Sequence, residues 1–98
     1  MLNINATKNE STLTLVLDGR LDTVTAPELE ANLKFGDAKL VVIDLKEVPY
    51  MSSAGLRLLL TSHKAMAAKG GRFEIVNVQS AVREVLEITG FSDILNIV

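Results

Sequence analysis

The chain contains no cysteine and no tryptophan, and it has one histidine and two prolines among its 98 residues. Without cysteine there is no disulfide, no thiolate metal site and no thiol nucleophile. The single histidine, His63, excludes a multi-histidine metal site within one chain. No apolar run approaches the ~20 residues that a membrane-spanning helix needs. These absences remove redox and metal functions from consideration, and we expect no metal and no cofactor.

Charge and hydrophobicity are both moderate. The formal net charge of −2 gives no reason to expect contact with nucleic acid. A hydrophobic content of 48% is enough for a core without disulfides. The first residues, Met1–Ala6, lack the basic start and the apolar run of a signal peptide. We therefore expect a single cytoplasmic domain over residues 1–98, with neither a membrane nor a nucleic acid as its partner.

Hydrophobic periodicity predicts an α/β fold. Strands are expected at residues 2–4, 12–17, 40–45 and 73–76, and helices from Thr25, over 54–69 and over 81–89, with residues 94–98 forming a last helix turn or an edge strand. The nearly continuous apolar run 40–45 is typical of a central strand covered on both faces. Because strand–helix–strand units make right-handed parallel crossovers, we predict a mixed sheet of four to five strands with helices mainly on one side.

Two helix starts carry capping signals. Thr25 to Glu28 is typical of a capping box, in which Thr25 caps the helix and Glu28 reaches back to it. The long helix follows Ser52 and Ser53 at a strand-to-helix junction, where backbone N–H groups lack internal partners. Ser53 is interpreted either as a plain N-cap or as a functional hydroxyl where a phosphate is favoured, and the two are compatible. Ser52 has the same ambiguity.

No catalytic constellation is present. A nucleophilic serine needs a general base, but His63 is about 15 Å along the same helix from Ser53 at 1.5 Å per residue. Gly70-Gly71 belongs to no phosphate-loop pattern and is interpreted as a turn. Asp22 follows a strand, either as a solvated turn residue or close to Ser53 if the two strands are neighbours. We therefore expect a binding protein and not an enzyme.

Several segments together resemble a known family. They are Gly19–Asp22, the helix from Thr25, Ile43–Leu45, Tyr50–Leu56 and Lys69–Phe73. In this order and spacing they are similar to bacterial STAS domains, specifically stand-alone anti-sigma-factor antagonists. The resemblance covers nearly the whole chain.

The resemblance implies a phosphorylation switch. It makes Ser53 the residue phosphorylated by a cognate anti-sigma factor that is also a serine kinase, and it implies a serine phosphatase that resets the switch. The unphosphorylated form would bind the anti-sigma factor and free the sigma factor. The resemblance places Asp22 beside the site, in a partner-binding surface that also includes Ser52, Ala54 and Gly55.

One position departs from the family pattern, and two alternative functions stay open. Well-known members carry aspartate where this chain has Ser52, so Ser52 is kept as an alternative phosphate acceptor. The first alternative is a STAS scaffold subunit of a transport or signalling assembly, without a switch. The second is a small nucleotide-binding or hydrolytic α/β domain, which the missing phosphate loop and the missing base disfavour.

Overall fold

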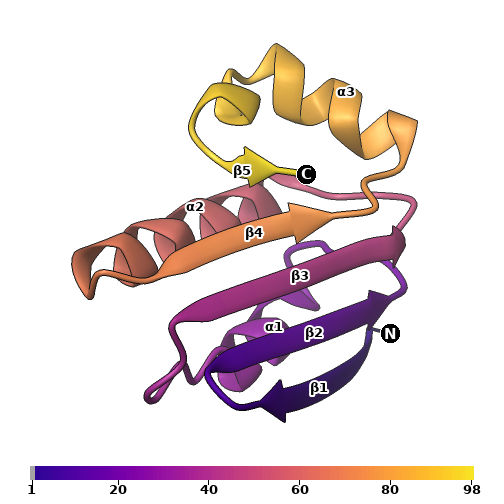
Figure 1. The fold of residues 1–98 in the computed structure, drawn as a ribbon. Helices are drawn as coiled ribbons and strands as arrows, with labels where there is room; N and C mark the ends of the chain where they lie inside the picture. The colour runs from indigo at the N-terminus through magenta and orange to yellow at the C-terminus, as the bar shows by residue number, and fades with distance from the viewer. Residues whose placement is uncertain (1) are drawn as a thin grey trace.

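The computed structural model describes residues 2–98, which form a five-stranded mixed sheet in the order β1-β2-β3-β4-β5 (Figure 1). The strands are β1 Asn3–Asn9, β2 Thr12–Asp18, β3 Leu40–Glu47, β4 Arg72–Val76 and β5 Asn96–Ile97. β1 and β2 pair antiparallel, whereas β2 to β5 pair parallel to their neighbours. The predicted α/β class and mixed sheet are confirmed, and the C-terminal tail forms the edge strand that was one of its two predicted structures.

Three helices connect the parallel strands. They are α1 Ala26–Asn32, α2 Ser53–Ala68 and α3 Ser80–Ile88, and a short 3-10 helix, η1 Phe91–Asp93, leads into β5. Each crossover leads to the next strand of the sheet, always in the same direction. Right-handed connections therefore place the helices on one face of the sheet. Figure 1 shows α1 and α2 behind the sheet. The long helix ends before Gly70, whose φ of +79° confirms the predicted glycine stop.

The core lies between the sheet and its helices. Alternate residues of the three central strands are buried, as one covered face requires. These residues are Leu13, Leu15, Leu17, Val41, Ile43, Leu45, Phe73 and Ile75. From the helices, Leu29, Leu59 and Leu86 are fully buried against this face. The sheet and its helices therefore hold the strand ends of β2 and β3 in fixed positions.

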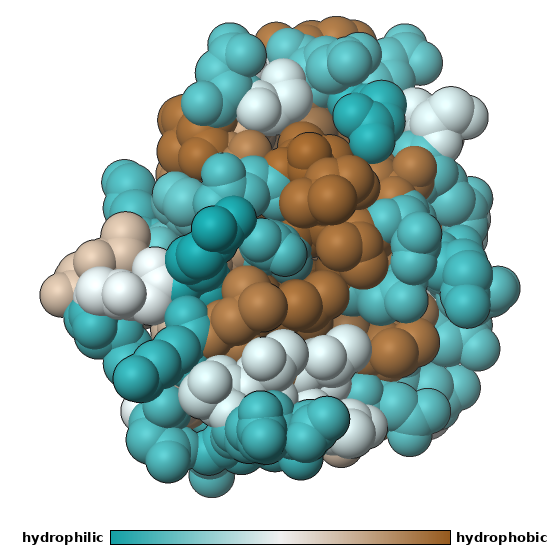
Figure 2. All heavy atoms as spheres, in the orientation of Figure 1, coloured by the Kyte–Doolittle hydropathy of each residue, from teal (hydrophilic) through white to brown (hydrophobic). Residues whose placement is uncertain are grey.

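The opposite face of the sheet is open to solvent. Val16, Leu40 and Val42 alternate with the core residues and are only half-buried. Figure 2 shows apolar side chains gathered across the middle of this face, with hydrophilic residues around them. The expectation that residues 40–45 are covered on both faces is therefore wrong, because all the crossovers run along the other side.

Candidate functional site

The loops that follow β2 and β3 lie side by side. Their backbones are joined by two hydrogen bonds, from Leu21 N to Tyr50 O at 3.1 Å and from Ser52 N to Leu21 O at 2.8 Å. An isolated parallel bridge pairs Leu21 with Met51. The strands are parallel neighbours, so their exits meet at one end of the sheet. Asp22 and Ser53, each one or two residues beyond this bridge, are brought to the same end.

Ser52, and not Ser53, caps the long helix. Ser52 has extended backbone angles, φ −89° and ψ 173°, and its side chain accepts a hydrogen bond from Gly55 N at 3.5 Å. The bond from its own N–H to Leu21 holds it in this extended pairing, so helical geometry starts only at Ser53. The interpretation of Ser53 as the N-cap is wrong. Within residues 2–98 the Ser53 hydroxyl makes no hydrogen bond, and the side chain is exposed.

Gly55 is buried against the bridge that joins the two loops. A Cβ atom at this position would lie 2.7 Å from Leu21 Cγ and 3.0 Å from Met51 Cγ. Glycine is needed there for close approach of the helix to the loops. Ala54 is half-buried beside it. Of the predicted partner-binding residues, the structure thus places Gly55 beneath the surface, and Asp22 and Ser52 at partly exposed positions.

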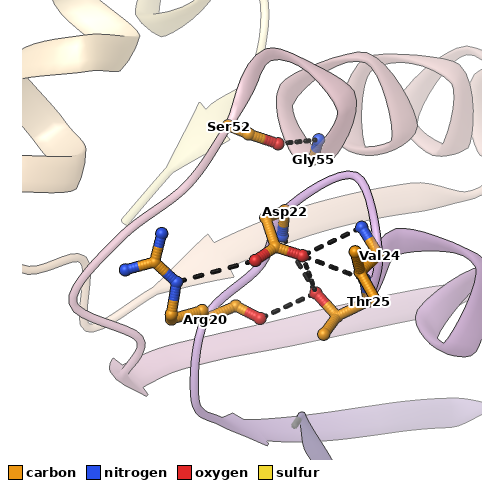
Figure 3. A network of polar contacts seen from close by, with 6 residues as sticks. All are labelled: Arg20, Asp22, Val24, Thr25, Ser52 and Gly55. Atoms are coloured by element: carbon orange, nitrogen blue, oxygen red, sulfur yellow. Dashed lines mark hydrogen bonds and ion pairs between the residues drawn. The ribbon is translucent and has the colours of Figure 1, made fainter.

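Asp22 organises the turn that precedes α1. Its Oδ1 accepts hydrogen bonds from the backbone N–H groups of Val24 and Thr25, both at 3.0 Å, as Figure 3 shows. Its Oδ2 lies 3.6 Å from Arg20 Nε. The N–H of Thr25 makes the largest contribution to holding the pKa of the Asp22 carboxyl below its ordinary value. Desolvation, the next largest effect, opposes it, and the Val24 N–H, the Thr25 hydroxyl and Arg20 make smaller contributions that also lower the pKa.

The predicted capping box at Thr25 is wrong. Thr25 has αR backbone angles, and its side chain makes no cap hydrogen bond to α1. Its hydroxyl instead donates to the Arg20 carbonyl at 2.7 Å and accepts from Asp22 N at 2.9 Å. The carboxylate of Asp22 competes successfully for the N–H groups of the turn because a charged acceptor forms the stronger bonds. Asp22 is therefore more than a solvated turn residue.

Three further exposed residues belong to the same end of the sheet. The Arg20 guanidinium carbon lies 4.2 Å from the centroid of the Tyr50 ring, a cation–π contact between the two loops. Tyr50 is 43% exposed and Val24 is 79% exposed. The sequence analysis did not select these residues, although Arg20 and Tyr50 both follow strand ends. We call Arg20, Asp22, Val24, Tyr50 and Ser53 together the Ser53 surface.

A groove between α1 and α2 begins next to the Ser53 surface. It has a volume of about 270 Å³, with Ala26 and Glu30 on the α1 side and Ala54 and Arg57 on the α2 side. Its lining also includes the apolar side chains of Pro27 and Leu58, so the groove combines apolar residues with one acidic and one basic side chain. It therefore extends the apolar and charged character of the Ser53 surface along α2.

His63 is a further residue that the sequence analysis considered. His63 is half-buried on α2, with its ring edge-on to Phe73 at 6.5 Å between centroids, which confirms its predicted place on a helix face. Within residues 2–98 no group of histidine, cysteine, aspartate or glutamate side chains could hold a metal ion. In the same part of the chain, no helix is long and apolar enough to cross a bilayer.

The fold and this pair of loops define a small α/β domain, and comparison with known proteins identifies its family. The family model described as STAS domain matches residues 3–98, so the chain belongs to the STAS-domain family, as its sequence predicted.

The relatives are named for one role. The anti-sigma-B factor antagonist of Staphylococcus aureus (strain NCTC 8325 / PS 47) is 30% identical over 99 residues, covering 98% of this chain and 92% of the relative. That of Bacillus subtilis (strain 168) is 28% identical over 101 residues, covering 98% and 90%. A crystal structure of an anti-sigma factor antagonist from Mycobacterium paratuberculosis has the same fold, with a TM-score of 0.88 and 24% identity, covering 99% of this chain and 85% of that one.

Proposed function

We propose that this chain is an anti-sigma-factor antagonist whose binding is controlled by phosphorylation of Ser53. Unphosphorylated, it holds an anti-sigma factor and thereby leaves the sigma factor free. The observation that carries the proposal is the exposed Ser53 hydroxyl, free of any capping role, at the start of α2 beside the Asp22 turn. The names of the relatives support the antagonist role.

A phosphate on Ser53 would change the surface without unfolding the domain. Ser52 supplies the cap of α2, and the Ser53 hydroxyl makes no hydrogen bond to any of residues 2–98. Phosphorylation adds about −1.5 to −2 charges at neutral pH, and such a charge is tolerated at a helix start. Facing an acidic or apolar partner surface, the same charge repels and is costly to desolvate. The complex dissociates while the domain stays folded.

The chemistry belongs to the partner. We propose that the anti-sigma factor is an ATP-dependent serine kinase and that a serine phosphatase reverses its action, both in the cytoplasm. In the forward step the bond from Ser53 Oγ to phosphorus forms and the bond from the γ-phosphorus to ADP breaks. The hydroxyl proton passes to a base of the kinase, since His63 is about 15 Å along α2 from Ser53. The chain itself is a binding module and acts as the phosphate acceptor.

The partner surface we propose is centred on Asp22 and Ser53. Ala54, half-buried at the entrance of the α1–α2 groove, lies at its border. Ser52 and Gly55 contribute through shape: Ser52 sets where the helix begins, and Gly55 lets the helix pack close to Leu21. The Arg20–Tyr50 pair supplies an aromatic and a cationic contact, two residue types that are enriched in binding hot spots.

Phosphopeptide analysis tests the acceptor. The wild-type chain, Ser53→Ala and Ser52→Ala are incubated with the cognate kinase and ATP, and phosphorylated peptides are located by mass spectrometry. We expect phosphate on Ser53 in the wild-type chain, retention in Ser52→Ala and loss in Ser53→Ala. Phosphate mainly on Ser52 would contradict the assignment, and no phosphate on any of the three chains would contradict the switch.

A further inference from the structure

Arg57 is an uncompensated cation on the same helix as Ser53. It follows Ser53 by four residues on α2, and both side chains are exposed. Side chains with this spacing lie on one helix face, with Cβ atoms about 5–6 Å apart. The first turn of α2 contains no acidic residue. The ion pairs formed within residues 2–98 leave Arg57 without an acidic partner, although Glu30 lines the same groove.

A second cation of the same end of the sheet, Arg20, is already engaged. Arg20 lies 3.6 Å from Asp22 through its Nε, and its guanidinium stacks over the Tyr50 ring. Moving Arg20 to a new anion would break both contacts. Among residues 2–98, Arg57 has neither an ion pair nor an aromatic partner to lose, so it can turn toward a new negative charge on its own helix.

We propose that a phosphate on Ser53 is held by Arg57, and that phosphorylation therefore withdraws this guanidinium from the α1–α2 groove. Guanidinium and phosphate pair through two parallel hydrogen bonds, which makes arginine well suited to the task. The order is also the favourable one, with the acidic group four residues before the basic group. A partner that uses the groove then loses a cationic contact in addition to meeting a new negative charge.

The test measures the phosphate directly and needs no partner. The proposal rests on the proposed function only in taking Ser53 as the acceptor, so phosphoserine is placed at position 53 of the full chain during translation. The second pKa of the phosphate is read by phosphorus NMR titration. We expect the pKa to rise by about 0.3 to 0.5 of a unit in Arg57→Gln, because a paired cation favours the dianion. The phosphate pKa of Arg57→Lys should lie between those of the wild-type chain and Arg57→Gln.

Two control variants decide the outcome. Lys64→Gln removes a cation of the same helix, eleven residues from Ser53 and about 16 Å along the axis, and should leave the phosphate pKa unchanged. Arg20→Gln should also change it less than Arg57→Gln does. An equal pKa in the wild-type chain and Arg57→Gln overturns the proposal, and so does a larger rise in Arg20→Gln or an equal rise in Lys64→Gln. A kinase that ignores Ser53 would defeat the proposed function and leave this result standing.

Discussion

The helices α1 and α2 both begin just beyond the end of a parallel strand, in loops joined by the Leu21–Met51 bridge. Before α1, the polar groups bind one another. The Asp22 carboxylate accepts from two backbone N–H groups and lies near Arg20, and Thr25 is only 4% exposed. Before α2, a side-chain hydrogen bond of 3.5 Å forms the cap, and the next hydroxyl, that of Ser53, makes no hydrogen bond within the described part of the chain.

This difference separates a fixed loop from a modifiable one. A hydroxyl that holds buried backbone groups, such as that of Thr25, cannot accept a phosphate without loss of structure. A hydroxyl that holds nothing can be modified at little cost to folding. The two helix starts thus differ at one end of the sheet: the α1 start gives a rigid frame, and the α2 start carries the hydroxyl that we propose as the switch.

The largest loss of stability is expected in the core beneath the two helix starts. Leu59 is 0% exposed on α2, so Leu59→Ala removes fully buried methyl groups. We expect it to lower the free energy of unfolding by about 2–5 kcal/mol. Chemical denaturation measures the change, with the half-buried Leu60→Ala as the control. Equal losses for the two variants would contradict the placement of Leu59 in the core.

The next largest effect is expected at the fixed loop. Thr25→Val keeps the shape of the side chain but leaves Asp22 N and the Arg20 carbonyl without their partner. We expect a loss of about 1–3 kcal/mol in unfolding free energy. The control is Thr61→Val on α2, whose exposed hydroxyl bonds to the Arg57 carbonyl and should matter little. A similar cost at both positions would remove the contrast between the fixed loop and an ordinary helix surface.

The Asp22 carboxylate should make the fixed loop sensitive to acid. Because the pKa of Asp22 is lowered in the folded chain, its stabilising effect is present above the ordinary value of 3.8 and is lost as the pH falls through the lower, folded value. At pH 7 the melting temperature of Asp22→Asn should therefore lie below that of the wild-type chain, and the gap should narrow below about pH 4. Asp93→Asn, an exposed control for which no such contacts are found within residues 2–98, should show no narrowing. A gap that is constant with pH would count against the role of the charge.

The sequence predicted the mixed sheet and the meeting of the Asp22 and Ser53 loops, but not how the polar groups pair. Alternating and continuous apolar runs were enough to predict the succession of strands and helices along the chain, and strand–helix–strand units predicted that the Asp22 and Ser53 loops meet if their strands are neighbours. The two helix caps were misassigned because capping residues were judged one helix at a time. Ser52 becomes the cap because its N–H binds Leu21 O in the other loop. The predicted capping box at Thr25 does not form because the charged Asp22 carboxylate accepts the hydrogen bond from the Thr25 N–H.

The burial of the sheet was also only partly predictable. The run 40–45 is apolar at almost every position, and this pattern cannot distinguish a strand covered twice from one covered once. The direction of the crossovers decides which face of the sheet is covered. All the connections are right-handed and run in the same direction, so the helices lie on the same face. Contacts such as Arg20 with Tyr50 depend on which loops meet, which becomes visible only after the parallel pairing is known.

The Ser52 cap should contribute less than the Asp22 turn. Its hydrogen bond to Gly55 N is long, so we expect Ser52→Ala to cost about 0.5–1 kcal/mol of unfolding free energy, at the low end for a cap. Ser52→Asp should restore the cap with a charged acceptor and recover the loss. Denaturation curves of the three chains check this order. A cost above that of Thr25→Val would reverse the comparison between the two helix starts.

The smallest effect on stability, and the largest on binding, is expected at Ser53. Ser53→Asp places a negative charge in the first turn of α2, where the helix dipole favours it, so the melting temperature should stay close to that of the wild-type chain. Affinity for the anti-sigma partner should nevertheless fall by about 1–3 kcal/mol, because the charge meets a surface built to accept a neutral hydroxyl. Ser53→Asn is the matched control, with nearly the same shape and no charge. Calorimetric titration with the partner and thermal melts of each variant separate the two effects. Equal affinity of the wild-type chain and Ser53→Asp would end the switch hypothesis, whereas an equal loss in Ser53→Asn would assign the effect to bulk instead of charge.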